Sequence, residues 1–321
     1  MSLTQEQFLN QILSAKGITH KIRAWQEKSF LKRNELQEYY EDFAHNPSLA
    51  VKLSDQKTLL KLIAEINQDN KFSFFYLKSF RYYPFVDHNL DLVILDKKEA
   101  FIEQLLQKGF KPYPNLADIR EPWKKFYQHP STSVLLHLHR QVSWNGIIAL
   151  DKTEVFARCR KTTVQDVEIS IPCPEDHFLI MAAHCLFENY YLNLGEILQL
   201  NHLLNTGLDF KKIYSYLHQY HWRNGLNLFN NHLASLLKYL DLSPHQLPVS
   251  RFYRLNPLVN FPYYLNYIHL LPFYFLKIIQ DLLTRPLNIP RQLFTYLFVG
   301  PIWQYSWKRF KKIWRKNKEK S

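Results

Sequence analysis

Cysteine and glycine are both scarce in this sequence of 321 residues, which contains three cysteines and seven glycines. The cysteines, Cys159, Cys173 and Cys185, are odd in number and form no CxxC pair. This pattern excludes a disulfide-rich extracellular scaffold and a cysteine-based zinc cluster, and it indicates reduced thiols in a cytosolic protein. The shortage of glycine also excludes a glycine-rich low-complexity chain.

A secretory signal is another feature that we do not expect in this chain. The first residues, MSLTQEQFLNQIL, show neither a basic start nor a long apolar run. Signal peptides need both, so the sequence predicts a cytoplasmic protein.

Apolar residues and uneven positive charge are what the sequence does contain. Its hydrophobic content of 46% predicts a folded core, in either two domains or one large one. The net charge is +13, but residues 285–321 hold ten Lys and Arg against one acid, Glu319, and so supply +9 of it. Because the remaining chain carries only 13 − 9 = +4, a general nucleic-acid-binding surface is weakly supported.

The first half of the chain changes from helical to strand-like periodicity near residue 70. Residues 1–70 read as helices, with capping residues expected at Thr4 and Ser54. Short segments rich in aromatic and branched residues follow at 71–80 and 90–96 and predict strands. The next segment, KKEAFIEQLLQKGF, predicts a helix that ends at Gly109.

After residue 130 the chain contains two more strand-like segments, followed by helices to about residue 241. Residues 131–144 and 164–172 read as strands, and Pro174 suits the first position of a helix. Together the patterns predict an α+β fold with a small mixed sheet. The expected organisation is an N-terminal helical segment (1–70), an α/β core (71–173), a helical bundle (174–245) and an aromatic, basic C-terminal segment (246–321).

Three polar residues alternate along FVDHNLDLVILD and raise the question of a site. On a strand, Asp87, Asn89 and Asp91 would share one face, while Leu90, Leu92 and Ile94 would line the other. Two interpretations remain open: a solvated strand end, or a rim of oxygen atoms that holds a metal ion.

Two histidines share a strand face in LLHLH. An HxH pair, here His137 and His139, can bind Zn²⁺ or Fe²⁺. Because the spacing supplies no third ligand, two partly buried histidines without a metal are the alternative.

With these segments in order, the chain resembles the nucleotidyltransferase superfamily of DNA polymerase beta. More narrowly, it is similar to the poorly characterised bacterial nucleotidyltransferase family proteins. The resemblance covers Leu53 to Leu240. It is carried by FYLKSF, NLDLVI, LLHLHRQVSW, PEDHFLIMAAH and DFKKIYSYLHQYHWRNGL in this order.

The resemblance implies Mg²⁺-dependent transfer of a nucleoside monophosphate from a nucleoside triphosphate to an unidentified acceptor. Two Mg²⁺ ions held by carboxylates would stabilise the attacking and leaving oxygens. Asp91 would be the main metal ligand, with Asp87 and Asn89 as auxiliary ligands. Lys78 and Ser79 would contact phosphate, and His139 would shape the neighbouring strand.

This sequence departs from the family pattern at three of those positions. Asn89 occupies the first position of the DxD pair, His137 occupies the place of a third carboxylate, and Ser79 replaces a glycine. The alternative is therefore a catalytically degenerate protein of the same fold that acts as a membrane-associated binding or adaptor module.

The C-terminal segment carries an aromatic stripe between basic residues. Trp303, Trp307, Phe310 and Trp314 step by four, three and four residues and would share one helix face. This pattern predicts a helix lying on an anionic membrane surface, and hence a peripheral location at the inner face of the membrane. The alternatives are packing against the body and binding of single-stranded nucleic acid. The basic residues around the stripe are Lys308, Arg309, Lys311, Lys312, Arg315 and Lys316.

Overall fold

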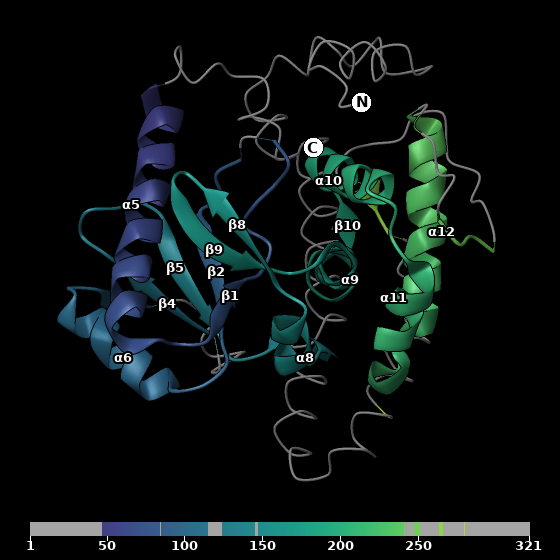
Figure 1. The fold of residues 1–321 in the computed structure, drawn as a ribbon. Coiled ribbons are helices and arrows are strands. Elements are labelled where there is room, and N and C mark those ends of the chain that lie inside the picture. Colours follow the sequence, from purple (N-terminus) through teal and green to yellow (C-terminus); the bar gives the residue numbers. More distant parts are fainter. Residues whose placement is uncertain are drawn as a thin grey trace, which may run out of the picture.

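The computed structural model confirms the predicted α+β class (Figure 1). A small sheet lies between two helices on one side and a group of helices on the other. The structure describes residues 47–240 with gaps at 84, 115–123 and 145–146, and in addition residues 242, 247–250, 263–265 and 279.

The central sheet has five strands in the order β1-β2-β5-β4-β3. Strands β2 and β5 are parallel neighbours, and the other pairs are antiparallel, so the sheet is mixed as predicted. A parallel pair needs a crossover connection, which here runs through the helix and strands between β2 and β5. The strands are β1 (Phe74–Tyr76), β2 (Asn89–Ile94), β3 (Lys111–Tyr113), β4 (Lys124–Gln128) and β5 (Leu135–His139).

Two helices cover one face of this sheet, α5 (Pro47–Asn70) and α6 (Lys98–Gln107). Alternate residues of β2 point toward them and share a buried cluster with residues of α5 and α6. The expected cap at Ser54 is wrong, because α5 begins at Pro47 and the Ser54 carbonyl accepts a bond from the Thr58 hydroxyl inside the helix. Residues 48–53 extend the helix backwards because most of them have good helix propensity. The expected stop of α6 is confirmed, since Gly109 has a φ of 90°.

The segment expected as one strand at 164–172 is a hairpin. Strands β8 (Arg160–Val164) and β9 (Val167–Ile171) meet at Gln165 and Asp166, whose φ angles are 50° and 68°. Two-residue hairpin turns favour such positive φ values, normally in Asn-Gly or Asp-Gly. The Gln-Asp pair lacks that sequence signal, which explains why the turn was missed.

The segment expected as one strand at 131–144 is also two strands. Strand β5 ends at His139. After residues 140–141 the chain continues as β6 (Val142–Trp144), which pairs with β7 (Ile147–Leu150). A short helix, α8 (Lys152–Ala157), follows this hairpin.

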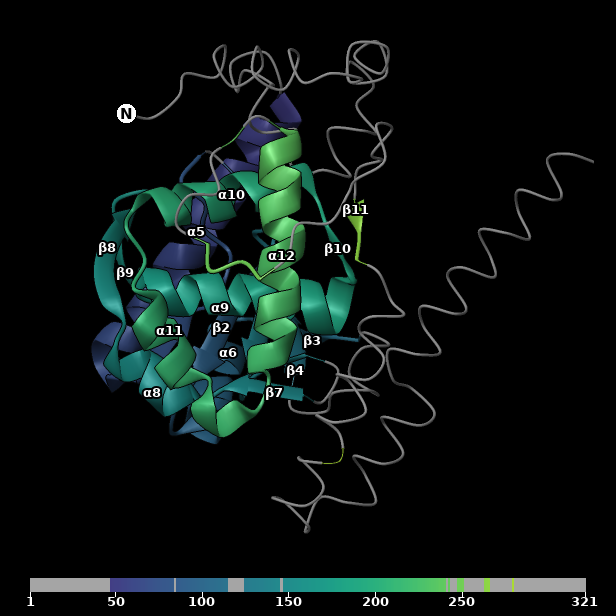
Figure 2. The same ribbon diagram turned by 90° about the vertical axis from the view of Figure 1, so that its right-hand side faces the viewer.

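The helices on the other face of the sheet form the larger hydrophobic core. Pro174 is the first residue of α9 (Pro174–His184), as predicted. In Figure 2, α9 runs across α12. The remaining elements on this side are the π-helical segment Cys185–Asn189, β10 (Tyr191–Leu192), α10 (Leu194–Asn205), α11 (Phe210–Tyr216), the 3₁₀ turn His218–Tyr220, α12 (Arg223–Tyr239) and β11 (Tyr263–Tyr264).

A buried ion pair connects three of these elements. The Arg158 guanidinium, which follows α8, donates from Nε and Nη2 to the Asp176 carboxylate at the start of α9, at 2.8 and 2.9 Å. Asp176 is fully buried, and the Cys173 thiol donates to the same carboxylate. Arg158 also lies 4.0 Å from the centre of the Tyr216 ring at the end of α11. The pair therefore joins the end of α8 to helices α9 and α11.

We predict that Arg158→Met lowers the free energy of unfolding by about 3–5 kcal/mol, because it leaves a buried carboxylate without its cation. Urea unfolding measures the change. Glu154→Gln is the matched control, since Glu154 lies 3.9 Å from Arg158 and is 44% exposed, and we expect a change within about 0.5 kcal/mol. Equal losses of unfolding free energy in the two variants would show that the Arg158–Asp176 pair does not stabilise the fold.

Candidate functional site

Two parallel strands bring the candidate residues to one place. Strands β2 and β5 pair with Asp91 opposite His137 and Val93 opposite His139. Residues two apart on a strand share a face, so Asp91, His137 and His139 project to the same side of the sheet. Val93 belongs to the hydrophobic cluster that includes α9, so this face is turned toward the helices behind the sheet.

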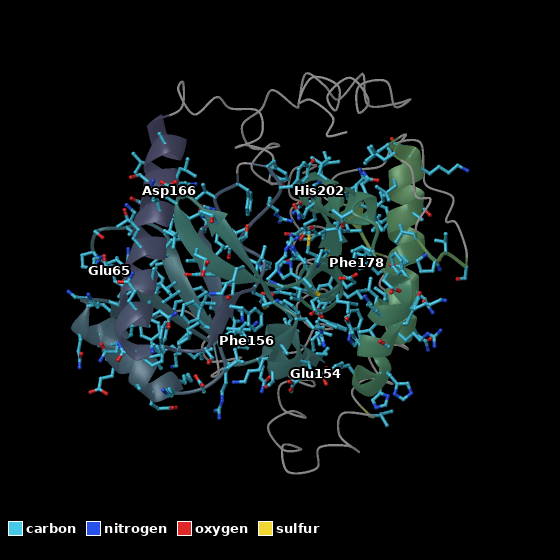
Figure 3. The ribbon with its side chains drawn as sticks, viewed as in Figure 1. Glu65, Glu154, Phe156, Asp166, Phe178 and His202 are labelled. Carbon is cyan, nitrogen blue, oxygen red and sulfur yellow. The ribbon has the colours of Figure 1, made fainter. Side chains whose placement is uncertain are left out.

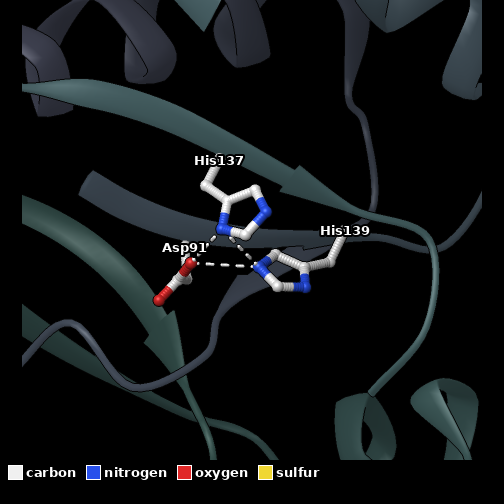
Figure 4. A group of neighbouring side chains, drawn as sticks. All are labelled: Asp91, His137 and His139. Atoms are coloured by element: carbon white, nitrogen blue, oxygen red, sulfur yellow. Dashed lines mark hydrogen bonds and ion pairs between the residues drawn. The ribbon is translucent and has the colours of Figure 1, made fainter. Parts of the chain in front are cut away.

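The three side chains meet at one carboxylate oxygen (Figure 4). Oδ1 of Asp91 lies 2.7 Å from Nδ1 of His137 and 3.0 Å from Nε2 of His139. The two ring nitrogens lie 3.1 Å from each other. The side chains of Asp91 and His139 are each 1% exposed, and that of His137 is 12% exposed. The cluster is thus compact and nearly closed to water.

Two further side chains contact the Asp91 carboxylate. The Asn89 amide donates to Oδ1 at 2.8 Å, and the Lys78 ammonium lies 3.4 Å from Oδ2. Asn89 and Asp91 are alternate residues of β2, whereas Lys78 follows β1. The sequence-predicted residues Lys78, Asn89, Asp91 and His139 are therefore brought together.

Ser79 supports the backbone of Asp91. In an antiparallel ladder, two facing residues exchange both backbone hydrogen bonds. The Leu77 N–H donates to the Asp91 carbonyl at 3.0 Å, but the Asp91 N–H donates to the Ser79 hydroxyl at 2.8 Å. Ser79 is fully buried. Its hydroxyl thus takes the place of a ladder acceptor, and its expected phosphate contact stays a prediction.

The electrostatics of the cluster favour an ionised carboxylate beside a neutral imidazole. Burial opposes the charge of Asp91, but Lys78 and the hydrogen bonds from His137 and His139 hold its pKa well below the usual value. Burial, with the neighbouring His137, lowers the pKa of His139 to about 3, against the attraction of Asp91. At neutral pH, His139 is therefore an uncharged imidazole.

Aromatic and charged residues surround this centre. Phe126 on β4 stacks on the His137 ring at a centroid distance of 3.9 Å and an interplanar angle of 10°. Lys124, which faces His139 across β4 and β5, is 2% exposed. Partial burial opposes the charge of Glu188 in the π-helical segment, yet Lys124, His184 and Lys78 lower its pKa to about 2. Lys124 and Glu188 were not predicted as site residues, because no local sequence pattern connects them to β2.

The donor set does not fit the pair of Mg²⁺ ions that the resemblance implies. Mg²⁺ takes oxygen ligands in octahedral geometry and is usually held by carboxylates. Among the residues that the structure describes, the only group that could hold an ion consists of Asp91, His137 and His139, with a single carboxylate. Imidazole nitrogens suit softer ions than Mg²⁺.

Comparison with family models gives a match that includes this site. Residues 88–238 match the model of a family described as an uncharacterised nucleotidyltransferase. The chain has a nucleotidyltransferase-fold core. Asn89, Asp91, His137 and His139 lie within the matched region, whereas Lys78 and Ser79 precede it.

Comparison with solved structures gives only distant similarities. Two solved structures are similar, one of the antibiotic-resistance factor ANT(2'')-Ia in solution and one of ANT(2'')-Ia in complex with adenylyl-2''-tobramycin. They are 12% and 10% identical, with TM-scores of 0.39 and 0.38. The matches cover 54% and 53% of this chain and 95% and 98% of those chains. No protein with curated function matches the sequence.

The remaining predicted site residues lie apart from the cluster or outside the described residues. Asp87 precedes β2, and its carboxylate accepts a bond from the His88 N–H at 2.7 Å; it is not part of the Asp91 group. The aromatic and basic stripe at 303–316 and the expected cap at Thr4 fall outside the described residues. None of the helices in the described part of the chain combines the length and hydropathy needed to cross a bilayer.

A separate groove lies on the α5 side of the sheet, with a volume of about 550 Å³. Figure 3 labels three of its lining residues, Glu65, Phe156 and Asp166. Its charged lining residues are Lys61, Glu65, Lys161, Asp166 and Glu168, and Asp166 also pairs with Lys57 at 2.7 Å. Because these charges offset one another, the groove does not select a ligand of one charge.

We predict that Ser79→Ala lowers the free energy of unfolding by about 1–3 kcal/mol, because the buried Asp91 N–H loses its acceptor. Chemical denaturation measures this change. Ser215→Ala is the control, since its hydroxyl bonds the Lys212 carbonyl in an exposed setting, and it should change stability by at most about 0.5 kcal/mol. An unchanged free energy of unfolding in the Ser79→Ala variant would show that the hydroxyl does not support Asp91.

Proposed function

We propose that this protein transfers a nucleoside monophosphate from a nucleoside triphosphate to an acceptor at the Asp91 cluster. One observation carries the proposal: Asn89 and His137 both contact the ionised carboxylate of Asp91. By the resemblance, these three residues stand at the positions of the family's metal-binding carboxylates. The family match over residues 88–238 and the α+β core support a nucleotidyl transfer function.

In this reaction an acceptor oxygen would form a bond to the α-phosphorus while the bond to the diphosphate breaks. The triphosphate is highly anionic, and positive charge is supplied by Lys78 beside Asp91 and by Lys124 opposite His139. Charged donors in a site of low dielectric stabilise developing negative charge strongly. Asn89 and Ser79 would hold Asp91 in place, and the proton of the acceptor hydroxyl would pass to water as the diphosphate leaves.

Mg²⁺ dependence remains a prediction of the resemblance. Because the donor set around Asp91 does not fit paired Mg²⁺, we assign no step of the reaction to that ion.

The second candidate is a catalytically degenerate binding or adaptor module. The observation in its favour is that an amide, Asn89, and an imidazole, His137, stand where the family pattern has carboxylates. Such a protein would bind a nucleotide weakly or not at all.

We predict that one of the four common nucleoside triphosphates stabilises the full chain against heat by about 2.7 kcal/mol at a hundred times its Kd. Each nucleotide is tested with and without Mg²⁺, and diphosphate release is followed in parallel. Lys78→Met should weaken binding by about 10–100-fold, because one charged contact is worth about 1.5–3 kcal/mol.

Lys57→Met is the control for that variant, because Lys57 pairs with Asp166 on the other side of the sheet and should leave nucleotide binding unchanged. Stabilisation without diphosphate release, over a range of hydroxyl acceptors, favours the binding module. No stabilisation by any triphosphate would contradict the transfer proposal and favour the degenerate module.

The membrane contact of the C-terminal segment is also a proposal. A chain truncated after Gln292 loses eight basic residues and the aromatic stripe. Each basic residue near an anionic bilayer is worth about 1 kcal/mol. We therefore expect the full chain, but not the truncated one, to co-sediment with vesicles rich in phosphatidylserine at low salt. Equal sedimentation of both chains would contradict the prediction.

A further inference from the structure

Hydrogen bonds alone do not satisfy the Asp91 cluster. Oδ1 of Asp91, Nδ1 of His137 and Nε2 of His139 lie within 2.7–3.1 Å of one another, so each atom is in hydrogen-bonding range of both others. A ring nitrogen carries either one proton or one lone pair, in the plane of its ring. The ring protons can therefore satisfy at most two of the three contacts. The third contact then brings together either two N–H donors or two lone pairs.

The surroundings do not relieve this conflict. The Asn89 amide donates to Oδ1, which is already shared by both imidazoles. The other carboxylate oxygen, Oδ2, lies 3.4 Å from the Lys78 ammonium, so this ion pair leaves the crowding around Oδ1 unchanged. Buried polar atoms normally have compatible partners, so three buried atoms whose contacts cannot all be satisfied point to a missing ligand.

We propose that Asp91, His137 and His139 bind one first-row transition-metal ion of the Zn²⁺ or Fe²⁺ class in place of paired Mg²⁺. Two imidazoles and one carboxylate form the donor set of catalytic zinc sites and of non-haem iron sites, and both leave at least one position open for another ligand. A cation would bind the three converging lone pairs at once and remove the conflict between the two rings.

The distances suit such an ion. Zinc binds nitrogen and oxygen ligands at about 2.0–2.2 Å. Three atoms separated by 2.7, 3.0 and 3.1 Å share a point about 2 Å from each, above their common plane. Small rotations of the side chains would widen the triangle toward tetrahedral angles. Lys78, beside Oδ2, would leave Oδ1 as the metal-binding oxygen.

This inference does not rest on nucleotidyl transfer. It depends only on the side chains of Asp91, His137 and His139, and it is tested without nucleotide. Its failure would leave the proposed transfer open, and failure of the transfer would leave the metal site open.

The test uses the full chain, prepared without a polyhistidine tag and freed of metal with a chelator. Isothermal titration measures binding of Zn²⁺ and of Mg²⁺, and the visible ligand-field absorption of added Co²⁺ reports its coordination. We expect one equivalent of Zn²⁺ to bind, a Co²⁺ spectrum of low-coordinate type, and Mg²⁺ to fail to displace either ion. His137→Asn should weaken Zn²⁺ binding by about 100-fold or more, since residues behind a metal ligand already contribute about 10–100-fold.

His88→Asn is the matched control, because His88 is an exposed histidine at the start of the same strand segment and is not part of the cluster. It should leave Zn²⁺ binding unchanged. Absence of Zn²⁺ binding, or equal binding by the wild type and a folded His137→Asn variant, would overturn the proposal.

His137→Asp provides a second variant in case His137→Asn does not fold. It replaces a nitrogen ligand by oxygen, so the preference for Zn²⁺ over Mg²⁺ should fall and the Co²⁺ spectrum should change. An unchanged preference in this variant would also overturn the proposal.

Discussion

The candidate site depends on one oxygen atom, Oδ1 of Asp91, to which two imidazoles and an amide converge. Parallel pairing of β2 with β5 makes this convergence possible, because it sets Asp91 opposite His137 in register. A shift of one residue would turn Leu90 or Leu92 to this face and move the carboxylate to the face covered by α5 and α6. The same register therefore fixes both the hydrophobic core and the polar cluster.

The position of the cluster between two packed layers explains its unusual electrostatics. Helices α5 and α6 cover one face of the sheet, and the helices beginning with α9 lie beyond the other. Low exposure strengthens every charge interaction within this layer, so Lys78 can keep Asp91 ionised even though burial opposes the charge. The Arg158–Asp176 pair also holds a buried carboxylate, through a two-pronged contact, but there burial outweighs the guanidinium and raises the pKa of Asp176.

Much of the fold could be predicted because its elements have strong local signals. Alternation in NLDLVI, Gly109 after α6 and Pro174 at the start of α9 each encode a local conformation, and all three agree with the structure. The Gln165–Asp166 turn and the start of α5 were missed because their residue types are weak signals. The grouping of Asp91 with His137, and the proximity of Lys124 and Glu188, come from strand order and packing. Local sequence patterns do not contain that information.

A crystal structure of the chelator-treated protein soaked with Zn²⁺, with anomalous scattering recorded at the zinc absorption edge, tests the central claim most directly. We expect a single anomalous peak in the cluster, about 2.0–2.2 Å from Oδ1 of Asp91, Nδ1 of His137 and Nε2 of His139. A map without a peak at this position, in which the two rings bond to water or turn away from Asp91, would contradict the account.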